Sequence, residues 1–337
     1  MDDQYTTSQE KRSGKGVSVI ICCYNSAARL PQTLWHLAEQ LVPEDFSWEI
    51  LLVNNASKDN TVASAIEIWH SFSPSNATFR VIEEPIPGQM YARKTGAIAA
   101  KYECLVFCDD DNWLGKNYVY LAWEMMAHDS NIGAGGGQNA PATDAPEYPD
   151  WFEEYKDKYA LGIPAQTSGD VSHRGFVLGA GLVTRRLLFL SINDEKYPSL
   201  LNGRNGEKLS TGDDFEYCKR LLLWGYKLHY QADMYLTHFI PKERLTIHHR
   251  EKLMEGIMDS RKVLGEYDLA VKLNNRNKHK NRWRLLFLAP FRIIAIKLGI
   301  SSREVINEAM TFFYLSPFSS KSDYTRLMIK KFLYRQS

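Results

Sequence analysis

The stretch CLVFCDDDNW, residues 104–113, joins a short apolar run to three consecutive carboxylates. Such a run is typical of a strand that is buried on both faces of a parallel sheet. Side chains at positions i and i+2 of a strand point to the same side, so Asp109 and Asp111 are expected to converge. Clustered carboxylates repel one another unless a cation offsets their charge, and carboxylate oxygens suit Mg²⁺ or Mn²⁺. A solvated turn or helix cap is the alternative for this cluster.

Similar apolar runs precede this stretch, with helical segments between them. Strands are predicted in VSVIICCYN (17–25), at the start of WEILLVNNASKDNT (48–61) and in TFRVIEEP, and helices in AARLPQTLWHLAEQL, 61–71 and 88–102. This alternation predicts a doubly wound α/β sheet. Ligands of such sheets bind beyond the carboxyl ends of the strands. The polar clusters CYNS, NNASKD and DDDN all fall at those ends.

The pattern changes after about residue 130. NIGAGGGQN is glycine-rich, YPDWFEEYKDKYALG is aromatic and predicted to be helical, and GFVLGAGLVTRR resembles a strand with a Gly-Ala-Gly turn. STGDDFEYCKRLLLWGYKLHY begins with Ser, Thr and Asp and continues as an amphipathic helix. From about residue 241 the chain is predicted to be helical and basic.

The composition is that of a soluble globular protein: 337 residues, 44% hydrophobic and 24% charged. The five cysteines include no CxxC pair, which indicates reduced, buried thiols in a cytosolic protein. The polar stretch 1–16 is expected to be a flexible tail and no signal peptide.

The net charge of +1 hides an asymmetry, because residues 1–240 carry −10 and residues 241–337 carry +11. A basic segment indicates an anionic partner, such as a membrane surface or nucleic acid, or basic helices that pack on the acidic domain. The most apolar stretch, 283–300, contains charges and Pro290, so it is not expected to span a bilayer. This stretch could instead form two short pieces that lie in the headgroup region of a membrane. It could also pack on the catalytic domain or on a second subunit.

The chain resembles the glycosyltransferase family 2 enzymes of GT-A fold over roughly residues 17–240. Six segments come in the family's order: VSVIICCYNSAARLPQTL, EILLVNNASKDNT, GQMYARKTGAIAA, LVFCDDDN, GAGLVTRR and GDDFEYCKRLLLWGYKL. The resemblance implies a mainly parallel mixed sheet flanked by helices, followed by a basic helical region. It also implies inverting transfer of a sugar from a nucleotide-sugar.

For the nucleotide, the resemblance implies that Tyr24, in a turn with Asn25, packs on the base, which is usually uracil. Asn54 and Asn55 stand where the family generally has an acid that accepts a hydrogen bond from the base; an asparagine can still accept through its amide oxygen. Arg93 is implied to reach the nucleotide or its phosphates, because a planar, always-charged fork suits that task.

For the chemistry, the resemblance implies that Asp111 binds Mn²⁺ or Mg²⁺ and that Asp109 contacts ribose or metal, with Asp110 in the same motif. His238 lies where some GT-A enzymes supply a metal ligand. Asp213 and Asp214 match the family's Glu-Asp pair, and Asp214 is implied to be the general base for the acceptor hydroxyl. Gly179 and Gly181 are expected to let backbone approach the donor sugar or acceptor.

We therefore expect a GT-A domain at 17–240 and a basic helical region at 241–337. The expected function is transfer of a sugar from a nucleotide-sugar to a hydroxyl of a glycan or lipid-linked saccharide in polysaccharide synthesis. We expect the donor to be UDP-linked. A nucleotidyltransferase and a non-catalytic glycan-binding protein are the alternatives. We expect no nucleic-acid partner and a cytoplasmic location, with peripheral contact at the inner face of the membrane and homo-oligomerisation left open.

Overall fold

The computed structural model describes residues 15–72, 76–201, 211–277, 290–291, 294–295, 297–299 and 324–333. Residues 1–14 of the predicted tail and most of the apolar stretch 283–300 lie outside these residues. In the first part of the chain the elements are β1 (Gly16–Cys23), α2 (Leu30–Ala38), β2 (Ser47–Asn55), α3 (Thr61–Ser71), β3 (Ala77–Glu84), α4 (Gln89–Ala99) and β4 (Cys104–Asp109). The predicted strand–helix alternation is therefore present here.

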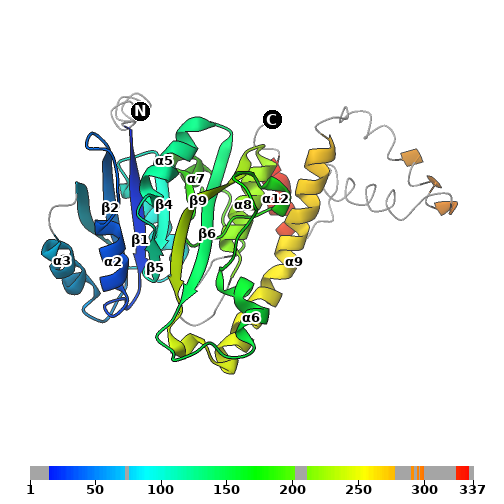
Figure 1. The fold of residues 1–337 in the computed structure, drawn as a ribbon. Coiled ribbons are helices and arrows are strands. Elements are labelled where there is room, and N and C mark those ends of the chain that lie inside the picture. Colours follow the sequence, from blue (N-terminus) through cyan, green and yellow to red (C-terminus); the bar gives the residue numbers. More distant parts are fainter. Residues whose placement is uncertain are drawn as a thin grey trace.

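In the described part of the chain the sheet has nine strands, in the order β3-β2-β1-β4-β8-β6-β9-β5, with β7 also paired to β9. The first four are parallel to one another, so their carboxyl ends reach the same edge (Figure 1). The remaining elements are β5 (Asn112–Leu114), α5 (Tyr118–His128), β6 (Ile132–Ala142), α6 (Phe152–Tyr155), β7 (Gly169–Asp170), β8 (Val183–Arg185), α7 (Arg186–Ile192), α8 (Asp213–Leu223), β9 (Lys227–Phe239), α9 (Ile247–Asn277) and α12 (Tyr324–Leu333).

The second half of the sheet is mixed. β8 runs antiparallel to β4 and to β6, and β6 is parallel to β9. The glycine-rich segment NIGAGGGQN lies in the long strand β6, although glycine is normally depleted in strands. Close packing explains Gly133 and Gly135: a Cβ on Gly133 would lie 2.7 Å from Tyr226, and a Cβ on Gly135 would lie 2.5 Å from Met125.

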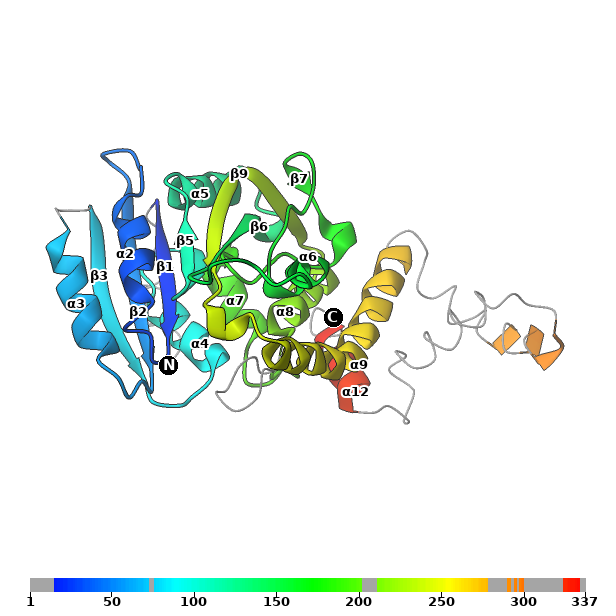
Figure 2. The same cartoon turned by 60° about the horizontal axis from the view of Figure 1, so that its bottom comes forward.

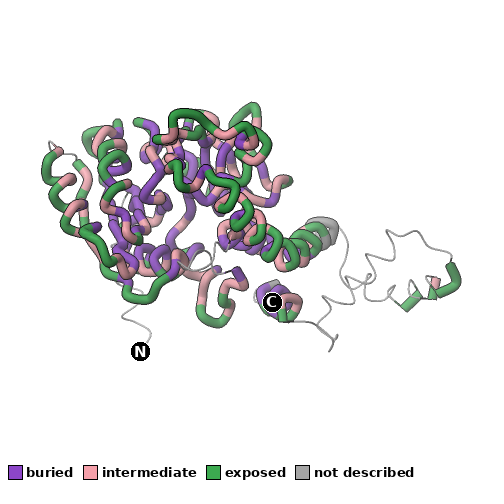
Figure 3. Tube along the Cα trace, turned by 90° about the horizontal axis from the view of Figure 1, so that it is seen from below, coloured by how far each residue is buried: buried purple, intermediate pink, exposed green. Residues whose placement is uncertain are grey.

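Two apolar cores lie on the two faces of the sheet. Val17, Val19 and Ile21 of β1 pack with α2, α3 and α5, whereas Ile20 packs on the other face with α4, α7 and α8. Alternate residues of a strand face opposite sides, so a continuous apolar run supplies both cores. The purple central strands in Figure 3 show this burial.

The helix α9 packs against α8 and α12 (Figure 2). Its Tyr267 and Ala270 are buried in the same core as α8. Tyr267 also donates a hydrogen bond to Glu216 (2.8 Å), which forms a buried ion pair with Arg220 (2.8 Å). In the part of the chain that the structure describes, no helix has both the length and the apolar character needed to cross a membrane.

Candidate active site

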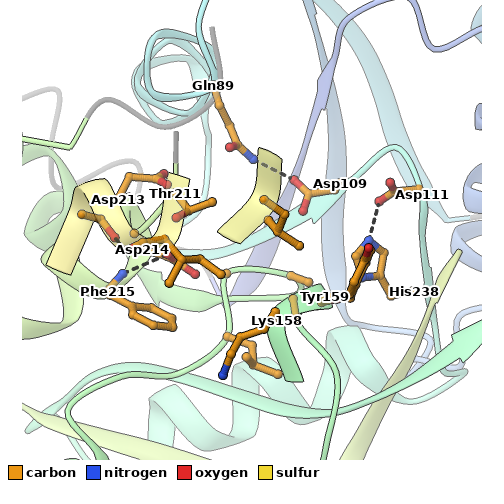
Figure 4. A pocket seen from close by; sticks show the side chains of 18 of the residues that line it. Gln89, Asp109, Asp111, Lys158, Tyr159, Thr211, Asp213, Asp214, Phe215 and His238 are labelled. Atoms are coloured by element: carbon orange, nitrogen blue, oxygen red, sulfur yellow. Dashed lines mark hydrogen bonds and ion pairs between the residues drawn. The ribbon is translucent and has the colours of Figure 1, made fainter. Parts of the chain in front are cut away.

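A cleft of about 1180 Å³ lies at the carboxyl ends of β1 and β4 and is closed on one side by α9. Two groups of carboxylates line it: Asp109 and Asp111 follow β4, and Asp213 and Asp214 begin α8. The two groups lie on opposite sides of the space, with Lys158 and Tyr159 between them at one margin (Figure 4). The structure therefore brings together the two acidic motifs that stand about 100 residues apart in the sequence.

Asp111 lies beside His238 and Arg244. Its Oδ2 accepts a hydrogen bond from Arg244 Nη1 at 2.8 Å, and its Oδ1 lies 3.5 Å from His238 Nε2. Strand pairing produces this arrangement, because Asn112 of β5 pairs with His238 of β9. Asp111 itself is in the turn between β4 and β5, so this turn, and not the alternation expected of a strand, sets its direction.

The hydrogen bond of Nδ1 determines the tautomer of His238. Nδ1 lies 2.8 Å from the carbonyl oxygen of Tyr159, which can only accept, so Nδ1 carries a proton. In the neutral ring Nε2 then keeps its lone pair and faces Asp111. A histidine that donates one N–H to a carbonyl and presents the other nitrogen is the usual arrangement of a metal ligand.

The donor set limits what kind of cation could bind. Among the described residues, no three His, Cys, Asp or Glu side chains are grouped closely enough to hold a metal ion. Asp111 Oδ1 and His238 Nε2 supply two donor atoms on the cleft wall. Mg²⁺ and Mn²⁺ are commonly bound by one or two protein ligands together with substrate phosphates. The residues present therefore fit an ion that binds together with a diphosphate.

The other two acids of the motif have different surroundings. Asp110 is turned toward the interior, where it forms an ion pair with Arg29 (2.5 Å) and accepts a hydrogen bond from Ser26. Burial, followed by the like charge of Asp111, raises the pKa of Asp110, and Arg29 opposes this shift. Asp109 accepts a hydrogen bond from Gln89 of α4 at 3.2 Å. Sequence reasoning missed Arg29, Gln89 and Arg244.

Asp213 forms a buried ion pair with Arg93, with Nη1 and Oδ2 3.2 Å apart. The guanidinium of Arg93 also lies 5.2 Å from the ring centroid of Phe107. Its Nε is buried and has no hydrogen-bond partner within the described part of the chain. The structure thus places Arg93, expected to contact the nucleotide, next to the first acid of the pair that matches the family's Glu-Asp motif.

Asp214 faces the cleft from the first turn of α8. Burial and the neighbouring charge of Asp213 raise its pKa to about 7, against the opposing effect of Arg93. Its Oδ1 accepts a hydrogen bond from the backbone N–H of Phe215 at 3.0 Å. A carboxylate whose pKa lies near neutrality is well matched to general base catalysis.

The residues expected to contact the nucleobase fall into two groups. Tyr24 and Asn55 line the cleft, and the side chain of Tyr24 is 45% exposed. Asn55 holds the 84–88 segment, because it donates to the carbonyl of Ile86 (2.7 Å) and accepts from the N–H of Gly88 (2.8 Å).

Asn54 and Asn25 do not line the cleft. Asn54 donates to Glu83 at 2.8 Å, and Asn25 accepts from the N–H of Lys58 at 2.8 Å. Asn25 also has a φ of 51°, in the left-handed region that asparagine tolerates better than most residues. Asn25 therefore shapes the loop beside Tyr24, whereas Asn54 links β2 to β3.

The aromatic residues near the cleft have different surroundings. Trp113 stacks on Phe239, with ring centroids 5.3 Å apart, and Trp151 and Phe152 pack in a small satellite core with Tyr159. Besides Tyr24, the rings of Tyr159, Phe176 and Phe215 line the cleft. Phe176 and Phe215 stack at 4.2 Å beside Asp214. Their positions depend on loop geometry that no short motif encodes.

Residues 18–174 match the family model described as "Glycosyl transferase family 2". A poly-beta-1,6-N-acetyl-D-glucosamine synthase of Staphylococcus epidermidis is 27% identical over 126 residues, which are 37% of this chain and 29% of that protein. The matched region thus spans less than a third of the relative.

Two solved structures of S. aureus TarS show the same fold. The first gives a TM-score of 0.51 at 17% identity and covers 94% of this chain and 54% of that one. Residues 1–349 of TarS in complex with UDP-GlcNAc also give a TM-score of 0.51 at 17% identity, and cover 94% of this chain and 89% of that one. The expected GT-A fold class is confirmed.

Proposed function

We propose that this chain, whose residues 18–174 are a glycosyl transferase family 2 segment, is an inverting glycosyltransferase that uses a nucleotide-sugar and acts in polysaccharide synthesis. The observation that carries the proposal is the position of Asp214 across one cleft from Asp109 and Asp111. A group that binds the leaving diphosphate and a group that activates the acceptor must lie on opposite sides of the reacting carbon. The cleft provides this arrangement.

On the donor side, the exposed ring of Tyr24 is available to stack on a base, and Arg93 provides a buried cation close to Asp109. Asp111 and His238 would hold a divalent cation, which when bound would supply positive charge to the leaving diphosphate. The TarS complex with UDP-GlcNAc supports a UDP-linked donor. The sugar and the acceptor are not assigned.

On the acceptor side, Asp214 accepts the proton of the acceptor hydroxyl as that oxygen attacks the anomeric carbon. The carbon–oxygen bond to the nucleoside diphosphate breaks in the same step, so the configuration inverts. Asp213 contributes through its charge, which helps to raise the pKa of Asp214 toward neutrality. The stacked rings of Phe176 and Phe215 form the wall next to this base.

The test is a thermal shift assay of the whole chain with UDP and Mn²⁺, with and without EDTA, followed by a panel of nucleotide-sugars. We expect UDP to raise the melting temperature more with Mn²⁺ than with EDTA, because a ligand that binds the folded state stabilises it. We also expect slow hydrolysis of one donor in the panel. Absence of both effects would contradict the proposal.

A further inference from the structure

The three consecutive carboxylates are neutralised in part by arginines of the chain itself. Asp110 pairs with Arg29, and Asp111 pairs with Arg244. Arg29 belongs to the segment before α2 and lies 31% exposed, whereas the side chain of Arg244 is 18% exposed and lines the cleft. Arg29 and Asp110 also border the cleft, but only the second pair involves the carboxylate that is proposed to bind a cation.

We propose that Arg244 is an internal counter-ion for Asp111 that transfers to the donor's diphosphate when cation and nucleotide bind together. This inference rests on the proposed function. Arg244 is thereby a positioning residue that makes nucleotide binding and cation binding depend on each other.

The geometry of Asp111 supports the first half of this proposal. Arg244 Nη1 lies 2.8 Å from Oδ2, while His238 Nε2 lies 3.5 Å from Oδ1. A divalent cation at the Oδ1 side would be close to the guanidinium, and like charges repel at this range. Arg244 therefore competes with a cation for the same carboxylate, so the affinity for the cation alone is low.

A diphosphate changes this balance. It brings two or more negative charges and a set of acceptor oxygens into the cleft, and a planar guanidinium binds such groups well. Arg244 then has a second anion to pair with, and Asp111 becomes available. Because linkage is reciprocal, cation and nucleotide increase each other's affinity by the same factor.

The backbone around Arg244 is held, so the exchange involves its side chain. The hydroxyl of Tyr159 donates to the carbonyl of Arg244 at 3.1 Å, and the N–H of Arg244 donates to the carbonyl of Pro241 at 2.8 Å. The carbonyl of the same Tyr159 accepts from Nδ1 of His238. Tyr159 thus fixes the ring of His238 and the backbone of Arg244, while the long arginine side chain can still reorient.

The test measures Mn²⁺ binding by electron paramagnetic resonance and UDP binding by calorimetry, on the whole chain and on Arg244→Gln. We expect Arg244→Gln to bind Mn²⁺ alone about 3- to 10-fold more tightly, because the competing charge is gone. We expect the same variant to bind UDP in the presence of Mn²⁺ several-fold more weakly. The two effects have opposite signs, which a misfolded or merely loosened variant would not produce.

Lys242→Gln is the matched control, because Lys242 is an exposed cation in the same short turn and does not line the cleft. It should leave both affinities near those of the unmodified chain. Arg244→Lys keeps the charge but loses the planar fork, so it should keep weak Mn²⁺ binding and recover only part of the UDP affinity. Unchanged or weaker Mn²⁺ binding by Arg244→Gln would overturn the inference. Failure of the unmodified chain to bind UDP and Mn²⁺ would overturn the proposed function as well.

Discussion

Gly179 packs directly against the carboxylate of Asp214. A Cβ on Gly179 would lie 2.6 Å from Asp214 Oδ2, closer than real Cβ contacts allow, and 3.1 Å from its Cγ. The Gly-Ala-Gly turn therefore lets backbone approach the proposed base, in addition to any approach to a ligand. The nearby carboxylate, and not the backbone conformation, explains why residue 179 is glycine. The φ angle of Gly179 is not in the left-handed region, whereas that of Gly181 is.

Gly179→Ala is expected to displace the carboxylate of Asp214 and to lower kcat by one to two orders of magnitude, because small misplacements of a catalytic group are costly. UDP affinity should change little. Gly136→Ala is the control, since a Cβ there would meet nothing within 4 Å. Steady-state kinetics and UDP titration of both variants test this, and equal loss in the two would contradict it.

Asp214→Asn is expected to lower kcat by about 10²- to 10⁴-fold, the usual contribution of a general base. Nucleotide binding should remain, because Asp214 lies across the cleft from Asp109 and Asp111. Turnover assays and calorimetric titration with UDP measure the two effects. Asp157→Asn, an exposed acid of the same cleft, should keep its activity. An equal loss of UDP binding in Asp214→Asn would show that Asp214 is not simply the base.

The raised pKa of Asp214 predicts a pH dependence of the rate. A base must be deprotonated to accept a proton, so kcat/KM should rise with pH through about 7 and level off above it. A profile with its acid limb near pH 4 would contradict this, because it would indicate a carboxylate with an ordinary pKa.

The same pKa predicts a change in stability. The folded pKa of about 7 lies above the ordinary value of 3.8, so the folded state binds more protons between these values. The contribution of Asp214 to stability is therefore present at low pH and lost as pH rises through 7. Asp214→Asn should thus gain melting temperature relative to the unmodified chain at pH 8 and less at pH 5. Thermal unfolding at both pH values measures this, and the opposite order would contradict it.

Asp110 and Asp111 are adjacent but should respond differently to substitution. Asp110→Asn weakens a partly buried ion pair with Arg29, so it should lower the free energy of unfolding by about 1–3 kcal/mol. Mn²⁺-dependent UDP binding should survive. Asp111→Asn should lose the Mn²⁺ dependence of UDP binding. Urea unfolding and calorimetry on the pair test this, and exchange of the two phenotypes would contradict it.

The first half of the fold was predictable because its strands are continuous apolar runs, each followed by a helix with an apolar face. The second half was less so. The long strand β6 is hard to recognise because it is rich in glycine, and close packing requires Gly133 and Gly135. The short strand β5 follows a turn at Asp110 and Asp111 that local sequence does not reveal.

For the site, the sequence placed Asp109–Asp111 at the ligand edge, and the family resemblance implied a role in catalysis for Asp213 and Asp214. The structure puts both groups on one cleft. The sequence could not show that Asp110 turns inward, because that depends on Arg29 lying 81 residues earlier in the chain. It could not identify Arg244, because its role depends on the pairing of β5 with β9. Peripheral membrane contact through 241–337 stays a prediction.

The hydrogen bond between Tyr267 and Glu216 has a practical consequence for anyone who shortens this chain. Glu216 also accepts from the N–H groups of Leu200 and Leu201, at 2.9 and 2.8 Å, so one carboxylate joins α9 to the segment before the proposed base. A version that stops near residue 240 would lose this hydrogen bond together with the wall of the cleft that α9 forms. Expression boundaries should therefore be set beyond α9, even though the sequence motifs end earlier.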